Sequence, residues 1–589
     1  MKKPRKNKDL SRRQFITMAG GALSLAALAS MGLKYGWSSE RPVVDITKMR
    51  FTETDSDVLV IGGGMAGLFA AVKAHDAGAK TLLVSKGRLG SSGQTPFAKG
   101  IFSFDSSKEH VTLDEFVESV SRSALGTNNP VYTRQMAEQS LARVNELREW
   151  GFFDSNLYNN SFRKPIDERE IPVMERITIT HLIKENGRIA GAAGFSLDEE
   201  KVHIFRAKSV ILCTGAGGFK PNGFPICDLT HDGTVMAYNI GAKITGKEWN
   251  DGHPGQATNA AACYDGWHGM FEQKPGTTGV GIRHDLGVEL NYMAYMSGNS
   301  VQMGPPGTEQ SQQIEGGPYR PAEFNQDGPQ DGGDRPDGDR PPRGEGSRPG
   351  GKKPDGEGDG PPGMGGSAVG GSSAGMSIHK SEGLVPINEK CESNIPGLYA
   401  AGDALGSYMA GAIYTQIGSS LAGSAVQGAV AAEAAAEYSK NVELSEISKS
   451  KRDKVQEEML APLKKEAGYS PAWVTQTLQG IMIPNFILYI KKENLLKAAL
   501  ANIEELRDHH MPMLKATDMH ELRLAHETAN MIISAEMKLK ASIMRKESRC
   551  SHYRLDYPDM DDKNWRVWIN IYKGKDGTMK FEKQPFVNS

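Results

Sequence analysis

Short apolar runs separated by glycine-rich turns dominate the first half of the chain. Residues 58–61 form a run of strand-forming residues, and residues 68–75 carry apolar side chains at helical spacing. A second apolar run at residues 81–84 predicts the next strand. A strand, a helix and a second strand in this order are typical of a parallel α/β unit. The pattern therefore predicts a fold of the α/β class.

Three glycines lie in the turn between the first strand and the helix. Gly62, Gly64 and Gly67 have the spacing G-x-G-x-x-G. This spacing suits a tight turn, a close approach of backbone to a pyrophosphate, and close packing of helix on strand. The N-terminus of the helix would then face the phosphate charge. The motif predicts a Rossmann-like domain that binds a dinucleotide, and the alternative is a purely structural turn.

The segment after the second strand departs from the usual dinucleotide pattern. Many such sites carry an acidic residue there, which binds the ribose, but this chain has Ser85 and Lys86. Further on, residues 114–150 have helical spacing, and residues 177–195 and 201–205 predict a β-meander with a hairpin turn at Asn186-Gly187.

A second glycine turn follows the meander. Residues 209–218 predict a buried strand that returns the chain to the side of the first glycine loop. Residues 230–233 then open a helix that ends near Gly241, and Asp232 is placed to bond backbone in that turn.

The second half begins with a low-complexity stretch. Residues 305–366 consist of Gly, Pro and polar residues with almost no apolar side chains, which predicts disorder. A strand and a tight turn follow at 396–403, and then a helix from 418 to about 438 that Ser419 or Ser420 can cap. Residues 451–464, 486–508 and 519–544 have helical spacing and predict a helical bundle, and residues 545–565 are polar and aromatic.

Charge and cysteine content narrow the classes of function. The 589 residues carry a formal net charge of -2, which gives no support for nucleic-acid binding. None of the five cysteines lies in a C-x-x-C or C-x-x-C-H motif. The sequence therefore predicts that this chain binds no metal and ligates no iron–sulfur cluster or c-type haem of its own. The cysteines are typical of packed thiols.

The N-terminus predicts export. Residues 1–10 are rich in Lys and Arg, Arg12 and Arg13 form a twin-arginine pair, and an apolar run of about 16 residues follows, which is short for a membrane span. We expect a twin-arginine signal, use of the twin-arginine export machinery in a folded state, and a periplasmic or extracytoplasmic location. The alternative is an uncleaved N-terminal anchor.

Taken together, these segments resemble the flavoprotein subunits of the succinate dehydrogenase, fumarate reductase and L-aspartate oxidase superfamily, and also the adenylylsulfate reductase flavoprotein branch. The resemblance rests on the glycine loop, the turns at 214–218 and 232–233, and residues 396–403, 418–421 and 545–565. It implies FAD as the cofactor. It also implies a nucleotide-binding domain, a capping domain and a C-terminal helical domain. With the signal and the insert read from composition, the expected order is twin-arginine signal 1–33, FAD-binding domain 50–240, reduced capping and substrate region 241–304, disordered insert 305–366, FAD-binding domain again 367–440, and C-terminal helical domain and tail 441–589.

The resemblance assigns a set of FAD-binding positions and also shows departures. Several members attach FAD covalently through a histidine before a threonine, but here Gln94 precedes Thr95, so we expect non-covalent FAD. A helix N-terminus at Ser419 would stabilise negative charge on the reduced flavin. The expected cofactor-binding residues are Gly62, Gly64, Met65, Ala66, Gly67, Ser85, Lys86, Ser92, Gly93, Gln94, Thr95, Thr214, Gly215, Asp232, Gly402, Asp403, Ser419, Ser420 and Leu421.

The substrate machinery of the family matches less well. Dicarboxylate-using members carry an Asn-Arg pair that holds a substrate carboxylate, and those positions are here Thr415 and Gln416. The capping-domain arginine that donates a proton to fumarate has no convincing match. The family's His-Pro pair does match, so we expect His253 to line the substrate pocket and to polarise substrate or transfer a proton. Weaker candidates, for which surface loops or packing beside the flavin are the alternatives, are Arg283, His379, Tyr408, Tyr414 and Gln416.

The function we predict from the sequence is that of an exported FAD-dependent oxidoreductase. Flavin N5 would exchange a hydride with an organic small molecule, and a separate iron–sulfur or haem protein would carry the electrons. One alternative is a fumarate reductase or succinate dehydrogenase with displaced substrate arginines. Others are a non-catalytic flavin electron-transfer subunit of a larger complex and a structural shell without cofactor.

Overall fold

The computed structural model describes residues 44–91, 93–98, 100–155, 157–220, 226, 228–256, 275–282, 301–302, 367–376 and 380–587. The predicted signal at 1–33 and the predicted insert at 305–366 lie outside the described residues, as does most of the region 241–304.

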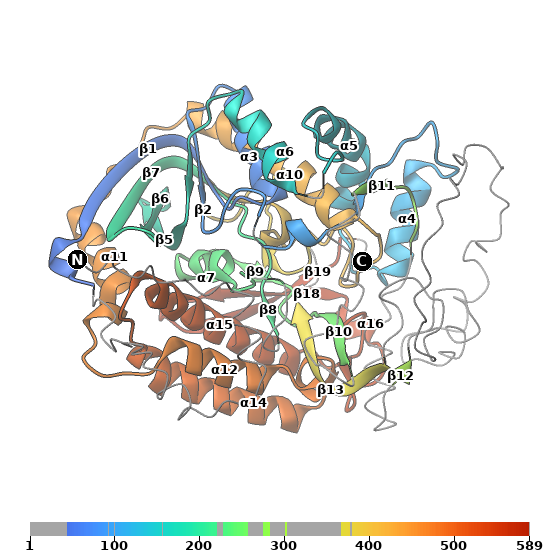
Figure 1. Cartoon of the computed structure of the whole chain (residues 1–589). Helices are drawn as coiled ribbons and strands as arrows, with labels where there is room; N and C mark the ends of the chain where they lie inside the picture. The colour runs from blue at the N-terminus through green and yellow to red at the C-terminus, as the bar shows by residue number, and fades with distance from the viewer. Residues whose placement is uncertain are drawn as a thin grey trace, which may run out of the picture. The chain divides into compact units, whose positions relative to one another are not determined.

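A mixed seven-stranded sheet carries the nucleotide-binding half of the chain (Figure 1). Strands β4, β2, β1 and β7 run parallel, and β6 and β5 continue from β7 as an antiparallel meander. Strands β6 and β15 both pair with the same edge of β7: β6 pairs with the first half of β7, and β15 pairs with the last three residues of β7. The bounds are β1 Arg50–Ile61, β2 Thr81–Ser85, β4 Val173–Glu175, β5 Ile177–Glu185, β6 Arg188–Ser196, β7 Lys201–Leu212 and β15 Leu398–Ala400.

The predicted α/β class is confirmed, with one extension. The strand expected at 58–61 is only the buried end of β1, because its first residues pair with the meander, from Arg50 opposite Lys201 to Asp55 opposite Arg206. The Asn186-Gly187 turn joins β5 to β6 with both residues at positive φ, 49° and 82°, as a type I′ hairpin turn requires.

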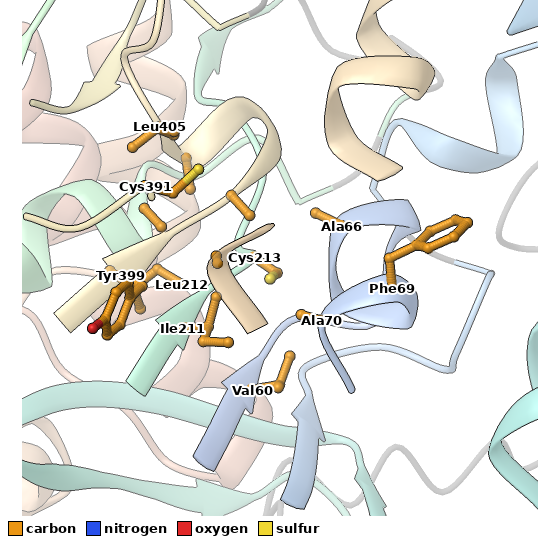
Figure 2. Packing of buried hydrophobic residues seen from close by; sticks show 14 of the residues in the cluster. Val60, Ala66, Phe69, Ala70, Ile211, Leu212, Cys213, Cys391, Tyr399 and Leu405 are labelled. Atoms are coloured by element: carbon orange, nitrogen blue, oxygen red, sulfur yellow. The ribbon is translucent and has the colours of Figure 1, made fainter. Parts of the chain in front are cut away.

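Helices α3 (Met65–Asp76) and α10 (Ser419–Lys440) pack against each other beside this sheet. They approach closely because Gly428 of α10 has no side chain, and a Cβ there would lie 2.4 Å from the carbonyl oxygen of Ala66. Figure 2 shows part of the core, where Val60 of β1, Ile211 of β7 and Ala70 of α3 belong to one buried cluster.

The stretch expected to be helical at 114–150 is divided in two. Helix α4 (Leu113–Ser123) begins with a capping box between Thr112 and Glu115. Helix α5 (Pro130–Glu149) begins anew with Asn129 as its cap, whose Oδ1 accepts from the backbone N–H of Val131 at 3.1 Å. Proline at the first position of α5 suits a helix start but not a helix interior.

The C-terminal part contains the predicted bundle. Helices α11 (Lys449–Leu460), α12 (Pro471–Met482), α14 (Glu493–Glu505) and α15 (Met519–Met544) form it, and α15 has the predicted bounds. The segment expected as one helix at 486–508 also holds the short helix α13 (Asn485–Leu488) and strand β16 (Ile490–Lys491). Helix α7 (Asp232–Asn239) contacts both β5 and α15, so it links the bundle to the sheet (Figure 1).

The tail forms a hairpin that the sequence analysis did not predict. Strands β18 (Val567–Lys573) and β19 (Met579–Pro585) are antiparallel, and β18 also pairs with β9 (Ile244–Thr245). Strand β9 in turn pairs with β14 (Gly383–Leu384). The terminal hairpin is therefore part of one four-stranded sheet with β9 and β14. Among the described helices, none combines the length and the apolar character that a membrane crossing requires.

Candidate cofactor and active site

A pocket lies where four parallel strands end. Strands β1, β2, β7 and β15 end at Ile61, Ser85, Leu212 and Ala400, and the residues just beyond each end line the same pocket. Ligands of open α/β sheets bind at this edge. The predicted residues that line it are Gly62, Gly64, Met65, Ala66, Ser85, Lys86, Gly93, Gln94, Thr95, Thr214, Gly215, Asp232, Gly402 and Asp403.

The first glycine turn forms a cradle made of backbone. Gly62 has φ +118°, and a Cβ there would lie 2.2 Å from the carbonyl oxygen of Cys213. Gly64 is the N-cap of α3 and offers no side chain to the first turn, where the hydroxyl of Thr95 accepts from the N–H of Met65 at 3.2 Å. Gly67 does not line the pocket. It lets α3 pack on the turn, because a Cβ there would lie 1.8 Å from the Gly62 carbonyl oxygen.

Thr214 presents a free hydroxyl at the second glycine turn. Its Oγ1 is buried and has no hydrogen-bond partner within the part of the chain that the structure describes, and Thr214 lines the pocket. A buried hydroxyl without a partner costs free energy, which a bound polar group would recover. Together with the glycine cradle and the helix N-terminus, this hydroxyl fits a dinucleotide.

One end of the pocket is closed by charged residues. The Nζ of Lys86 lies 2.9 Å from Oδ2 of Asp232, 2.7 Å from Oε1 of Glu527 and 3.6 Å from Oδ1 of Asp228. The backbone contact expected for Asp232 is wrong as stated, because the hydrogen bonds found for its carboxylate come from the side chains of Lys86, Thr230 and Asn530. Burial raises the pKa of Glu527, and Lys86 offsets this only in part.

The turn after β15 adds a second buried ion pair at the pocket. Asp403 lines the pocket and pairs with Lys380, which is fully buried and also donates to Ser424 at 3.1 Å. Burial lowers the pKa of Lys380 in spite of the Asp403 carboxylate. Sequence reasoning missed Lys380 and Ser424, since neither lies in a motif that identifies it.

The predicted cap of α10 is wrong. The N-cap residue is Gly418, in the left-handed region with φ +77°, where a Cβ would lie 2.6 Å from the N atom of Phe102. Ser419 is already the first helical residue, and its hydroxyl donates to the carbonyl of Gln416 at 2.8 Å instead of capping the helix. Ser419, Ser420 and Leu421 do not line the pocket, and Leu421 packs in the hydrophobic core.

The structure describes only some of the predicted catalytic residues. His253 lies in β10 (Asp251–Gln256), opposite Ala374 of β13 (Ser367–Met376), and its side chain is not described. Arg283, His379 and the predicted cofactor residue Ser92 lie outside the described residues. The hydroxyl of Tyr414 accepts from the N–H of Gly418 at 3.1 Å.

Gln416 and Tyr408 have structural contacts. The buried carboxamide of Gln416 donates to the carbonyl of Gly279 at 2.9 Å and accepts from the N–H of Gly281 at 3.3 Å, which fixes residues 279–282. Tyr408 stacks on Trp568 with ring centroids 4.8 Å apart, and its hydroxyl lies 3.0 Å from that of Thr245.

A buried network of charges lies behind the pocket. Glu382 accepts from Lys247 at 2.5 Å and lies 3.3 Å from Nδ1 of His231, the N-cap residue of α7. Burial, together with the nearby Lys247 ammonium, lowers the pKa of His231 to about 4, so the imidazole is neutral at pH 7. Burial also holds the pKa of His552 well below its usual range, with help from the Lys491 ammonium.

Stability should fall as the pH is lowered from 6.5 to 4. In this window the unfolded chain protonates His231, whose ordinary pKa is 6.5, while the folded protein does not, so the unfolded state binds more protons. The loss attributable to His231 should reach about 2–3 kcal/mol near pH 4. Thermal unfolding at a series of pH values measures it.

His231→Asn is the matched variant for this prediction. Asparagine tolerates the left-handed backbone of this position, φ 59°, and does not titrate. It should therefore flatten the decline in melting temperature, whereas His509→Asn at an exposed position should not. Parallel pH profiles for all three proteins would contradict the assignment.

Two family models match the chain. An FAD-binding domain model matches residues 57–163, and a model of the fumarate reductase flavoprotein C-terminus matches residues 475–589. The first match covers the glycine cradle and the second covers α15 and the tail. The cofactor of this chain is therefore FAD, and the glycine cradle and the Thr214 hydroxyl of the pocket fit it.

Full-length relatives agree with these matches. An uncharacterised FAD-dependent oxidoreductase of Methanocaldococcus jannaschii is 26% identical over 90% of this chain and 98% of its own. One subunit of the fumarate reductase (CoM/CoB) of Methanothermobacter marburgensis is 24% identical over 86% and 95%. The solved adenylylsulfate reductase of Archaeoglobus fulgidus has the same fold, with a TM-score of 0.68 at 20% identity over 92% and 98% of the two chains.

Proposed function

We infer that this chain, an FAD-dependent oxidoreductase of the fumarate reductase and succinate dehydrogenase flavoprotein type, works outside the cytoplasm on an organic small molecule and exchanges electrons with a separate carrier protein. The observation that carries the proposal is the pocket at the four strand ends, lined by glycine turns from separate segments. When bound, FAD supplies hydride transfer at N5. The location rests on the twin-arginine pattern of the first 33 residues.

Different residues of the pocket would contact different parts of FAD. The Gly62–Gly64 turn and the N-terminus of α3 would hold the pyrophosphate, and Thr214 and Asp232 offer further polar contacts. His253 is our candidate for holding or moving a proton at the substrate. Its backbone is fixed in β10, and that strand follows the buried segment 247–250 directly.

Substrate reduction tests the proposal directly. The purified holoprotein is reduced anaerobically with a viologen, and reoxidation of the flavin is followed after adding α,β-unsaturated acids, beginning with fumarate. Rapid reoxidation by one acid and not by its saturated analogue is the expected result. If no acid in the set reoxidises the flavin while a carrier protein does, the electron-transfer role becomes the better hypothesis.

Reduction of fumarate is the second candidate function. In its favour, the Methanothermobacter marburgensis fumarate reductase (CoM/CoB) chain matches this one nearly end to end. Against it, Thr415 and Gln416 stand where dicarboxylate-using members of the resembled family carry an Asn-Arg pair, and the carboxamide of Gln416 is already bonded to backbone. Turnover of fumarate at a rate above that of every other acid would decide for it.

His253→Ala should lower turnover with the true substrate about a hundredfold, the usual contribution of a general acid or base. The flavin content should stay at the wild-type level, since the variant leaves the glycine cradle and the Thr214 hydroxyl unchanged. Steady-state kinetics and the visible flavin spectrum measure the two effects. Unchanged turnover would remove His253 from this role.

The flavin should be released by denaturation. Gln94 lines the pocket next to Thr95, and a carboxamide does not form the histidyl–flavin bond known in related flavoproteins. After acid precipitation, all yellow colour should be in the supernatant, and the intact mass should equal that of the polypeptide. A fluorescent protein band after denaturing electrophoresis would contradict this expectation.

A further inference from the structure

Helix α15 reaches the cofactor pocket through the lysine that follows β2. Lys86 and Asp232 line the pocket, whereas Glu527 and Asn530 belong to α15, more than 290 residues further along the chain. Glu527 accepts from Lys86 at 2.7 Å, and Asn530 donates to Oδ1 of Asp232 at 2.8 Å. Because residues three apart share a helix face, α15 contacts both pocket residues at once.

The contact is largely withdrawn from solvent. The side chains of Glu527, Asp232 and Lys86 are 7%, 14% and 17% exposed. Arg523 lies 3.4 Å from Glu527 and 3.7 Å from Asp228, so two cations face three carboxylates. Removing the Glu527 charge would leave Lys86 with Asp232 at 2.9 Å and Asp228 at 3.6 Å, but would take away its shortest contact and its only one with α15 among the described residues.

We propose that Glu527 makes α15 part of the flavin site. Glu527 acts through its contact with Lys86, and Asn530 acts in the same way through Asp232. Together these contacts couple the binding of FAD to the docking of α15 on α7. Glu527 is a positioning residue in this scheme. The pocket residues hold the dinucleotide, and α15 fixes the pocket residues. Bound FAD orders Lys86 and Asp232, and these side chains then hold α15 more firmly. The proposal rests on FAD being the cofactor and not on the substrate or location proposed above.

Glu536 supplies a matched control on the same helix. Its side chain is also 7% exposed, and it pairs with Arg507 and Lys540 at 2.5 Å each. None of these three residues lines the cofactor pocket. Glu527→Gln and Glu536→Gln therefore remove equivalent charges from one helix, and only the first touches the flavin site.

The test measures FAD affinity and helix protection together. Apoprotein is titrated with FAD by flavin fluorescence, and amide exchange of residues 519–544 is followed with and without FAD. Glu527→Gln should raise the Kd for FAD about tenfold and abolish the FAD-dependent protection of α15. Glu536→Gln should stay within twofold of wild type and keep the protection.

A double variant separates this coupling from a general loss of stability. If Glu527 acts through Lys86, the Kd of the Lys86→Met/Glu527→Gln protein should equal that of Lys86→Met alone. Full additivity, or a Glu527→Gln Kd no higher than that of Glu536→Gln, would overturn the proposal. Should Glu527→Gln not fold, Asn530→Ala keeps every charge, and an unchanged Kd and protection in that variant would overturn it equally.

Discussion

Arg545→Met is expected to lower the free energy of unfolding by about 3–5 kcal/mol, the cost of breaking a buried ion pair from one side. Arg545 is fully buried and lies between two carboxylates, 3.0 Å from Glu248 and 2.7 Å from Glu547. It also donates to the carbonyls of Trp565 and Val567 at 3.1 Å and 2.5 Å. Methionine fills much of the same space but donates no hydrogen bond.

Two of the lost contacts explain the size of the effect. Without Arg545, Glu248 would keep no cation within ion-pair distance among the described residues, while Glu547 would still have Arg549 at 2.9 Å. The Val567 carbonyl belongs to the first residue of β18 and the Trp565 carbonyl lies two residues before it, so this end of the tail would lose its anchor as well.

Urea unfolding of wild type and variant measures the change. The control is Arg50→Met, which breaks an exposed pair with Glu199 and should cost at most about 0.5 kcal/mol. Adding Glu248→Gln to Arg545→Met should recover part of the stability, because it removes the orphaned charge. A loss below about 1 kcal/mol, or no recovery in the double variant, would mean that the network is not compensated as its geometry indicates.

The strand–turn–helix units could be predicted because their signals are local. A run of strand formers, glycines at fixed spacing and a helical pattern all lie within about 20 residues of Gly64, and each has one physical meaning there. The ends of β1 and β7 converge because parallel strands place their carboxyl ends at one edge. The gathering of separate glycine turns at one pocket thus followed from the sequence.

Ion pairs between distant segments could not be predicted in the same way. Glu527 meets Lys86 because α15 packs against the FAD-binding domain, and a single charged residue on a helix has no periodicity that identifies its partner. Lys380 meets Asp403 across 23 residues of irregular chain and short strands, where no motif pairs them. The wrong cap at Ser419 has a different cause. Serine is a preferred N-cap residue, but a close approach to Phe102 requires glycine at the cap position itself.

The terminal hairpin had a signal that was not used. Asp576 and Gly577 form a turn dipeptide between two runs of strand formers, and Gly577 has φ +79°. Reading residues 441–589 as helices and a tail gave this dipeptide no weight. The strands flanking it pair over seven residues, from Val567 opposite Pro585 to Lys573 opposite Met579.

Gly67→Ala is expected to abolish tight FAD binding, because the added methyl group has no room. A Cβ at Gly67 would lie 1.8 Å from the carbonyl oxygen and 2.9 Å from the carbonyl carbon of Gly62. Both are backbone atoms of the cradle, so either the turn or the N-terminus of α3 must move. We expect at least a tenfold higher Kd for FAD and a loss of about 3 kcal/mol in stability, the upper end for overpacking. Flavin content per polypeptide and thermal unfolding measure these effects.

The control is Gly480→Ala in α12, where an added Cβ would have nothing within 4 Å. This variant should bind FAD normally and be slightly more stable, because alanine is the better helix former. A Gly67→Ala protein with normal flavin content and stability would refute the close packing of α3 on the Gly62 turn.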